Sequence, residues 1–508
     1  MIARKINNKI NCSLYSFFSF PMFLFLLFAY IQLISIAYAS VKSGGSSFVE
    51  VSYTESVEYL TNPGIGWQHM PNIGSQMLPE TVESIPREQI SWKILNPGEN
   101  IYNWSILDGY IDAAKKRGNQ VSFRIYTMRG ESFGGHQVPD WVIKKGAKIT
   151  NGAPDYSNCV YQEEFGKFIN QVVNRYDGNS SIAFIDISGY GNFNEWSWQD
   201  GVTEFDKKWE EDYKLNRANR DSFSTLDGQT RRRLVDTFIG GSYIGHKCRD
   251  NNNKVLSVNY SYPGFKYTQL VMPYAGIRQS TQYVYVMRKD VGFRFDCLGS
   301  TTLDNIRTKL SNEVNNIWKN APVIFEFCAY LNNNLYSQAQ ATLKFAHGSI
   351  VRDNIRSQFR DSKSILNLML KAGYRYYLKR ARYLNTFLNN KLILEMTWNN
   401  VGYAPYYKKM GQDFELRVLL FKQPNLTIAR EYILNTDISK WMPADNLDNQ
   451  NSTPDYKVFL DQNVGNLEKG VVYSIYVGIY DKISKKFINI ASNGSKHNNL
   501  IFIGNISH

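Results

Sequence analysis

Short apolar runs alternate with longer amphipathic stretches from about residue 60 to 350, and this alternation limits the fold more than any other feature. VSFRIY (121–126) precedes YQEEFGKFINQVVNRYDG (161–178), whose apolar residues have helical spacing, and the apolar run IAFIDIS (182–188) follows. Strands that alternate with helices pair in a parallel sheet. A unit of about 35–45 residues, repeated over roughly 300 residues, predicts an α/β fold of the (β/α)8 type, the TIM barrel.

Further apolar runs belong to the same pattern: WKIL (92–95), which precedes the helix-like LDGYIDAAKKRG (107–118), and then VLSVNYS (255–261), VGFRFDCLG (291–299) and PVIFEF (322–327). We place IAFIDIS as the fourth strand of the barrel and PVIFEF as the seventh. A doubly wound sheet usually has a G-x-G-x-x-G turn after its first strand. NPGIGWQ (62–68) lacks the third glycine and a following helix, so we favour the barrel.

The pattern changes after about residue 370. KLILEMTWNN (391–400), FELRVLLFK (414–422) and VVYSIYVGIYD (471–481) are separated by turns rich in Asn, Pro and Gly, with no long helix between them. This predicts a C-terminal antiparallel β-sandwich of about 135 residues. The expected domains are therefore a barrel over residues 40–370, which would carry any catalytic site, and a sandwich over residues 371–508.

The N-terminus has the pattern of a secretory signal peptide. Arg4, Lys5 and Lys9 precede an apolar stretch over residues 17–37, and Ala37-Tyr38-Ala39 forms a small-residue cleavage site. We expect residues 1–39 to be removed and the protein to be secreted or otherwise extracytoplasmic. The alternative is an uncleaved membrane anchor, because an apolar stretch of about 20 residues can span a bilayer.

Charge and cysteine content fit an extracytoplasmic protein. The formal net charge is +13, and the basic residues are scattered apart from the triplet at 231–233, which argues against a nucleic-acid partner. Without the signal, four cysteines remain for up to two disulfides, and three pairings are open. They are Cys159, Cys248, Cys297 and Cys328. Sequons for N-glycosylation begin at Asn103, Asn179, Asn259, Asn425, Asn451, Asn493 and Asn505. The oligomeric state stays open.

Two glutamates mark the candidate site. Glu195 lies in GYGNFNEWSW (189–198), after the fourth strand, and Glu326 lies in the seventh. Catalytic groups of TIM barrels stand at the C-terminal ends of strands, so these carboxylates can meet although 131 residues separate them. Hydrolysis of a glycosidic bond uses two carboxyl groups, and apolar surroundings raise the pKa of the one that donates a proton.

The neighbours of Glu195 predict a sugar-binding cleft. We expect the substrate to contact Arg124, Tyr190, Asn194, Trp196 and Trp67, with the aromatic faces stacking on sugar rings and the amide binding a hydroxyl group. No metal or cofactor is expected, because His136, His246 and His347 lack ligand spacing.

Other roles for these acids stay open. Glu195 could be a structural carboxylate, and Glu326 could pair with Arg124 or Arg294. Asp186 and Asp296 are rival carboxylates at strand ends.

The pair Asn194-Glu195 after strand four, with Glu326 ending strand seven, resembles the clan A glycoside hydrolases, which are retaining enzymes on (β/α)8 barrels. This resemblance implies that Glu195 is the acid/base and Glu326 the nucleophile. NPGIGWQ, WKILNPGENIYNW (92–104), VPDWV (138–142), IDISGYGNFNEW and GYRYYL…WNNVGYAPYY (373–407) together resemble a poorly characterised family of secreted barrel proteins, known as domains of unknown function, with a C-terminal sandwich. The resemblance covers about residues 55–480.

Two functions follow as hypotheses. The first is a retaining glycoside hydrolase that acts on a polysaccharide or glycoconjugate; the second is a non-catalytic carbohydrate-binding or adhesion protein on the same scaffold. A separation of roughly 5–5.5 Å between the two carboxyl groups indicates retention, and about 6.5–9.5 Å indicates inversion. Burial of Glu326 against an arginine, with no path to solvent, would favour the binding protein.

Overall fold

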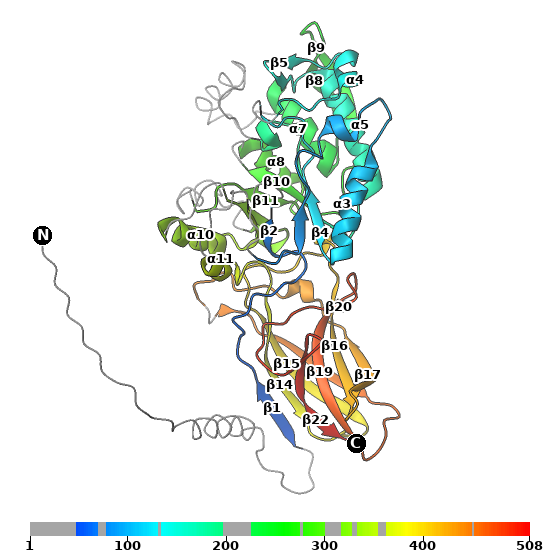
Figure 1. Ribbon diagram of the computed structural model, residues 1–508, viewed down its shortest axis with the longest axis vertical. Coiled ribbons are helices and arrows are strands. Elements are labelled where there is room, and N and C mark those ends of the chain that lie inside the picture. The colour runs from blue at the N-terminus through cyan, green and yellow to red at the C-terminus, as the bar shows by residue number, and fades with distance from the viewer. Residues whose placement is uncertain are drawn as a thin grey trace, which may run out of the picture. The chain divides into compact units, whose positions relative to one another are not determined.

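Eight parallel strands between residues 66 and 353 form a nearly closed ring, which confirms the predicted (β/α)8 barrel (Figure 1). In chain order they are β2 (Gly66–His69), β3 (Val82–Ser84), β4 (Gln120–Phe123), β7 (Ile182–Asp186), β10 (Leu270–Tyr274), β11 (Gly292–Phe295), β12 (Val323–Glu326) and β13 (Gly348–Asp353). Hydrogen-bonded ladders join them in the order β2-β13-β12-β11-β10-β7-β4-β3. The first and eighth strands of the barrel, β2 and β13, are therefore neighbours.

This computed structural model describes residues 47–69, 78–130, 134–196, 225–274, 278–299, 316–327, 333–353, 362–449 and 452–508. The signal peptide expected at residues 1–39 lies outside these ranges. Within them, no helix is both long enough and apolar enough to cross a membrane.

Helices follow most of the barrel strands and cover the ring. The principal ones are α3 (Trp104–Arg117), α4 (Asp140–Lys145), α5 (Cys159–Tyr176), α7 (Leu226–Ile239), α8 (Arg278–Met287), α10 (Asn333–Phe345) and α11 (Ser362–Met369). Helix α5 buries the periodic residues that predicted it, including Phe165, Ile169 and Val173. It begins after Asn158, whose side chain accepts a hydrogen bond from the backbone N–H of Tyr161.

Two of the runs expected in the ring fold differently. WKIL forms the short helix α2 (Trp92–Leu95), which is capped by the side chain of Ser91. VLSVNYS lies in β9 (Val255–Tyr262), which pairs antiparallel with β8 (Gly241–Arg249) in a separate two-stranded sheet. The fifth barrel strand is instead β10, whose sequence LVMPY was not expected to be a strand. Short apolar runs do not distinguish these outcomes by periodicity, although the fourth and seventh strands were placed correctly.

A disulfide fixes one of the open cysteine pairings. Cys159 and Cys248 are bonded with an S–S distance of 2.04 Å, which joins the start of α5 to β8 across 89 residues of sequence. Cys297 is disulfide-bonded as well. Disulfides of this kind are typical of proteins that fold in an oxidising compartment.

The C-terminal part is the predicted antiparallel sandwich. One sheet has the order β1 (Phe48–Ser52), β14 (Tyr376–Leu384), β15 (Lys391–Asn400), β18 (Tyr456–Asn463). The other has the order β17 (Thr427–Leu434), β16 (Phe414–Lys422), β19 (Val472–Asp481), β22 (Leu500–Ser507), β21 (Lys496–His497), with β20 (Lys486–Phe487) on β19. Leu394, Trp398, Leu416 and Ile475 belong to the core that the two sheets share. Strand β1 comes from before the barrel, and the boundary expected at residue 370 stays a prediction.

A segment between β15 and β16 closes the N-terminal end of the barrel. Ala404, Tyr407 and Met410 form a buried apolar cluster with barrel residues Val82, Ala183, Phe184, Val271, Ile324 and Ile350. The side-chain amide of Gln120, at the start of β4, donates to the carbonyl of Met410 at 2.5 Å.

Candidate active site

Strand alternation places charged side chains above the apolar floor of the barrel. On β7, Asp186 is two residues beyond Phe184, and the same step leads from Ile324 to Glu326 on β12 and from Ile350 to Arg352 on β13. Residues two apart on a strand point to the same face. The charged groups therefore gather at the C-terminal ends of the strands, where TIM barrels hold their active sites.

Asp186 anchors the two arginines at the centre of this end. Its Oδ2 lies 3.1 Å from Arg124 Nε and 2.6 Å from Arg294 Nη1, and all three side chains are at most 3% exposed. Burial raises the pKa of Asp186, and the positive charge of Arg124 acts in the opposite direction. Asp186 is thus a supporting carboxylate here, rather than a rival for the catalytic role.

The loop that carries Glu195 has a strained backbone. Phe193 and Trp196 have positive φ angles of 51° and 57°, which are unfavourable for bulky side chains, and Asn194, a residue type that tolerates this region better, has a φ of 55°. Glu195 itself has φ −100° and ψ 9°. Strain of this kind persists only where surrounding contacts fix the backbone, and it is concentrated at functional sites.

Hydrogen bonds from three side chains, those of Asn194, Trp196 and Arg124, hold this loop. Asn194 Oδ1 accepts from the backbone N–H of Thr127 at 2.6 Å, and its Nδ2 donates to Thr127 Oγ1 at 2.8 Å. Trp196 Nε1 donates to the carbonyl of Ile187 at 3.0 Å. Arg124 Nη1 donates both to the carbonyl of Phe193 at 2.8 Å and to Glu195 Oε1 at 2.9 Å.

Four of the predicted substrate contacts are core residues instead. Asn194, Trp196 and Trp67 are fully buried and Tyr190 is 1% exposed. The Tyr190 hydroxyl donates to Asp227 at 2.7 Å and its ring stacks on Trp196, while Trp67 packs against Phe327. The prediction that they line a sugar cleft is therefore wrong, because their aromatic rings and the amide are used inside the fold. Arg124, the fifth predicted substrate contact, is also buried at 2% exposure and bonds Asp186 and Glu195, so its contact with a sugar stays a prediction.

Glu195 and Glu326 do come together, and Asp296 joins them. One carboxylate oxygen from each of the three lies within 4.8 Å of those of the other two. The side chains of Glu195 and Asp296 are 18% exposed, whereas that of Glu326 is 5% exposed. Asp296 directly follows β11, and the backbone N–H of Leu298 donates to the carbonyl of Glu326 at 2.9 Å.

Arginines distinguish the three acids electrostatically. Glu326 lies 3.6 Å from both Arg294 Nε and Arg352 Nη1, so two positive charges stand beside its carboxyl group. Burial and the charge of Asp296 raise the pKa of Glu195 to about 8, although Arg124 acts against them. Burial and Glu326 raise the pKa of Asp296 as well. The sequence analysis did not predict that Arg352 belongs to the site. Its position two residues after the apolar Ile350 on the same strand was the signal that could have indicated it.

Three clustered carboxylates could in principle hold a cation. Arg294 lies within 3.9 Å of an oxygen of each one, with distances of 3.8 Å to Glu195, 3.9 Å to Asp296 and 3.6 Å to Glu326. A guanidinium group in this position offsets the negative charge that would attract a metal ion. We therefore assign no metal to the cluster.

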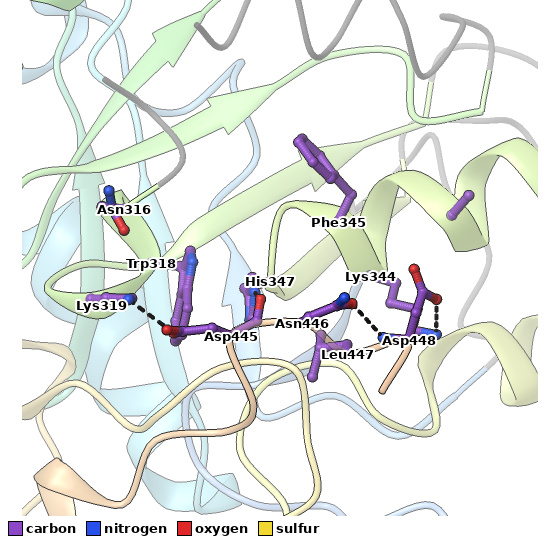
Figure 2. Close-up of a pocket in the computed structure, with 11 residues that line it drawn as sticks. Asn316, Trp318, Lys319, Lys344, Phe345, His347, Asp445, Asn446, Leu447 and Asp448 are labelled. Atoms are coloured by element: carbon purple, nitrogen blue, oxygen red, sulfur yellow. Dashed lines mark hydrogen bonds and ion pairs between the residues drawn. The ribbon is translucent and has the colours of Figure 1, made fainter. Parts of the chain in front are cut away.

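A separate pocket of about 500 Å³ lies beside residues that precede β12 and β13 (Figure 2). Its charged side chains are paired with one another, since Lys319 Nζ lies 2.8 Å from Asp445 and Lys344 Nζ lies 2.5 Å from Asp448. Trp318 is only 3% exposed and stacks on His347 at 3.6 Å. Both of the carboxylates that line this pocket, Asp445 and Asp448, are in ion pairs, so we assign no chemistry to it.

Fold and site together resemble the clan A glycoside hydrolases: a (β/α)8 barrel with carboxylates that follow the fourth strand and end the seventh. Residues 70–226 match the family model of glycoside hydrolase family 42, described as beta-galactosidase. The matched part contains Glu195 but ends before Glu326. A search of curated proteins finds no match to the chain.

Solved structures similar to this chain include several glycoside-degrading enzymes. The catalytic domain of the beta-amylase from Paenibacillus polymyxa is 13% identical, with 61% of this chain and 98% of that chain covered and a TM-score of 0.34. Xylanase 10B from Thermotoga maritima is 11% identical, with 60% of this chain and 96% of that chain covered and a TM-score of 0.33. The beta-galactosidase from the psychrophilic Marinomonas ef1 is 13% identical, with 58% of this chain and 56% of that chain covered and a TM-score of 0.33. At such identities the function has to be inferred from the site itself.

Proposed function

We propose that the protein is a secreted retaining glycoside hydrolase in which Glu195 is the acid/base and Glu326 the nucleophile. The main support is the approach of their carboxylate oxygens to within 4.8 Å. An inverting enzyme needs roughly 6.5–9.5 Å between its carboxyl groups to admit a water molecule, whereas a retaining enzyme needs about 5–5.5 Å. The substrate class is a polysaccharide or glycoconjugate.

In the first step, an oxygen of Glu326 attacks the anomeric carbon while the glycosidic C–O bond breaks. Glu195 donates its proton to the departing oxygen, and its raised pKa of about 8 keeps that proton available at neutral pH. Arg294 and Arg352, each 3.6 Å from Glu326, hold the attacking side chain between two guanidinium groups. The product is a glycosyl ester on Glu326.

In the second step, water attacks the anomeric carbon, the ester bond breaks, and Glu195 takes a proton from the water. The charge of Glu326 is one of the factors that raise the pKa of Glu195. The pKa of Glu195 therefore falls once Glu326 is esterified, and this change converts the acid into a base. Arg124 keeps the side chain in place through both steps, because it binds the carboxylate and the loop backbone.

One observation favours a second candidate, a carbohydrate-binding protein without catalysis. Glu326 is nearly buried and lies between two arginines, an arrangement that also suits a purely structural carboxylate. The side chains of Glu195 and Asp296 are each 18% exposed, however, and a carboxylate oxygen of each lies within 4.8 Å of one of Glu326. We therefore prefer the hydrolase.

The test is a screen of the secreted protein against a panel of glycans, with release of reducing ends as the signal. Glu195→Gln should lower kcat by about 10²–10⁴-fold, with a smaller loss on substrates whose leaving group needs no proton. Glu326→Gln should abolish turnover, and a fluorinated sugar that traps the ester should label Glu326 alone. Glu163→Gln, an exposed change on α5, is the matched control. Full activity in both site variants would refute the assignment, and binding without release of reducing ends would favour the second candidate.

A further inference from the structure

The third carboxylate of the site has no role in the two steps above. We propose that Asp296 is a positioning residue that shares one proton with Glu195 and so keeps Glu195 in the acid form before each turnover. This inference rests on the proposed function of Glu195. It concerns how the site holds its proton, which the choice of acid and nucleophile leaves open.

The charges of the described site residues do not balance without a proton. Their carboxylates outnumber their guanidinium groups by one: Asp186, Glu195, Asp296 and Glu326 against Arg124, Arg294 and Arg352. Buried like charges a few ångströms apart cannot all ionise at moderate cost. One proton bound among the four acids restores neutrality.

The distances indicate which acids hold that proton. Asp186 is compensated twice at hydrogen-bond distance, by Arg124 and Arg294. Asp296 is compensated least, because its nearest guanidinium nitrogen is 3.9 Å away and its Oδ1 has no hydrogen bond among the described residues. Glu195 lies within 4.8 Å of it. The proton therefore belongs to the pair of Glu195 and Asp296.

Asp296 cannot easily turn away from this position. Cys297, directly after it, has a positive φ of 63° and is disulfide-bonded. Leu298 is hydrogen-bonded to the backbone of Glu326 on the neighbouring strand. The backbone on the C-terminal side of Asp296 is thus held at two successive residues.

The other groups that face Glu195 have the opposite sign, are neutral, or are compensated. From the β4 side these are Arg124, at 2.9 Å, and the phenol of Tyr126. From β11 and β12 they are Arg294, at 3.8 Å, and Glu326, which has two arginines of its own. Among the residues that the structure describes, Asp186 on β7 and Arg352 on β13 belong to the same group of charges. Asp296 is the strongest electrostatic contribution that raises the pKa of Glu195, after burial.

The experiment compares Asp296→Asn with wild type and with Asp112→Asn, an exposed change on α3. The asparagine keeps the shape and removes the charge, so Glu195 should lose its proton more readily. The alkaline limb of kcat/KM against pH should move down by about 1 pH unit or more. Asp296→Glu should keep the limb near that of wild type. If Asp296→Asn does not fold, Asp296→Ser serves as the variant without charge.

A second readout does not depend on turnover. Infrared titration of the full chain should show a protonated-carboxyl band that disappears near pH 8 in wild type, disappears at lower pH in Asp296→Asn, and is reduced in Glu195→Gln. An unmoved limb together with an unmoved band would overturn the proposal, as would a rise in KM alone, which indicates a substrate contact. A shifted band in a protein that cleaves no glycan would keep the shared proton and refute the hydrolase.

Discussion

Replacing Asn194 by alanine should weaken the fold and the chemistry together, because its side chain fixes the loop that carries Glu195. The change removes two short hydrogen bonds to Thr127, at 2.6 and 2.8 Å, and leaves the fully buried N–H of Thr127 without that acceptor. A buried group left unsatisfied costs about 1–3 kcal/mol. Alanine at a φ of 55° adds roughly 1–2 kcal/mol that asparagine largely avoids. Together these two contributions should lower the free energy of unfolding by about 2–5 kcal/mol.

Asn194→Gly separates the two contributions. Glycine loses the same hydrogen bonds but tolerates the positive φ, so it should be about 1–2 kcal/mol more stable than the alanine variant. Urea unfolding followed by tryptophan fluorescence measures the difference between variants at equal slope. The kcat should fall by about 10²-fold in both, since a displacement of about 1 Å of a catalytic group has that effect. KM should change little.

Two outcomes would refute this reasoning. Wild-type stability and kcat in Asn194→Ala would show that the hydrogen bonds to Thr127 do not hold the loop. A raised KM at unchanged stability would instead return Asn194 to the role predicted from the sequence, that of a contact to a sugar hydroxyl.

Three further predictions concern the scaffold. Replacing Cys159 and Cys248 together by serine should lower the free energy of unfolding by about 4–5 kcal/mol, because the bond closes a loop of 89 residues; an unchanged urea midpoint would contradict this. Tyr407→Ala should cost about 3–5 kcal/mol and Tyr407→Phe about 1 kcal/mol, since the ring is buried in the barrel floor and its hydroxyl is hydrogen-bonded; equal losses would contradict it. Burial would raise the pKa of Asp290, but hydrogen bonds from Arg288 and Lys409 lower it overall, so Asp290 stabilises the fold above pH ~4 and less as the pH falls further. Asp290→Asn should therefore destabilise by roughly 0.5–1 kcal/mol at pH 7 and by less near pH 3, a modest figure because the carboxylate is partly exposed; the same loss at both pH values would contradict it.

Periodicity was sufficient for the architecture but not for every element. The sequence of α5 predicted a helix because five apolar residues recur at helical spacing and are buried on one face: Phe165, Phe168, Ile169, Val172 and Val173. The four residues of α2 did not, since an apolar run of that length fits a strand equally well. LVMPY was not predicted to be a strand, because a proline interrupts it. The sequence of β9 was wrongly expected in the barrel, because the residues of a strand do not show which strand it pairs with.

The sequence allowed us to predict that Glu195 and Glu326 lie close together, but not which residues surround them. Glu195 and Glu326 could be placed because strand count sets the position of a residue around a barrel. Trp196 and Tyr190 were assigned to a cleft because an aromatic residue beside glycines fits a platform and a core equally well. Their burial depends on how the strained loop turns, and that in turn depends on Asn194 and Thr127, which are 67 residues apart in the sequence.

The segment that closes the barrel floor also bears on how the protein is made. The eighth barrel strand ends at Asp353, yet the floor is completed only by Ala404, Tyr407 and Met410. During synthesis, which starts at the N-terminus, the barrel therefore stays incomplete until at least fifty residues beyond Asp353 have been made. Strand β1 likewise cannot form its sheet until its partner β14, which begins at Tyr376, has been made. A protein truncated after the last barrel helix would accordingly expose the apolar floor to water, and export as an unfolded chain would let all of these pieces meet at once.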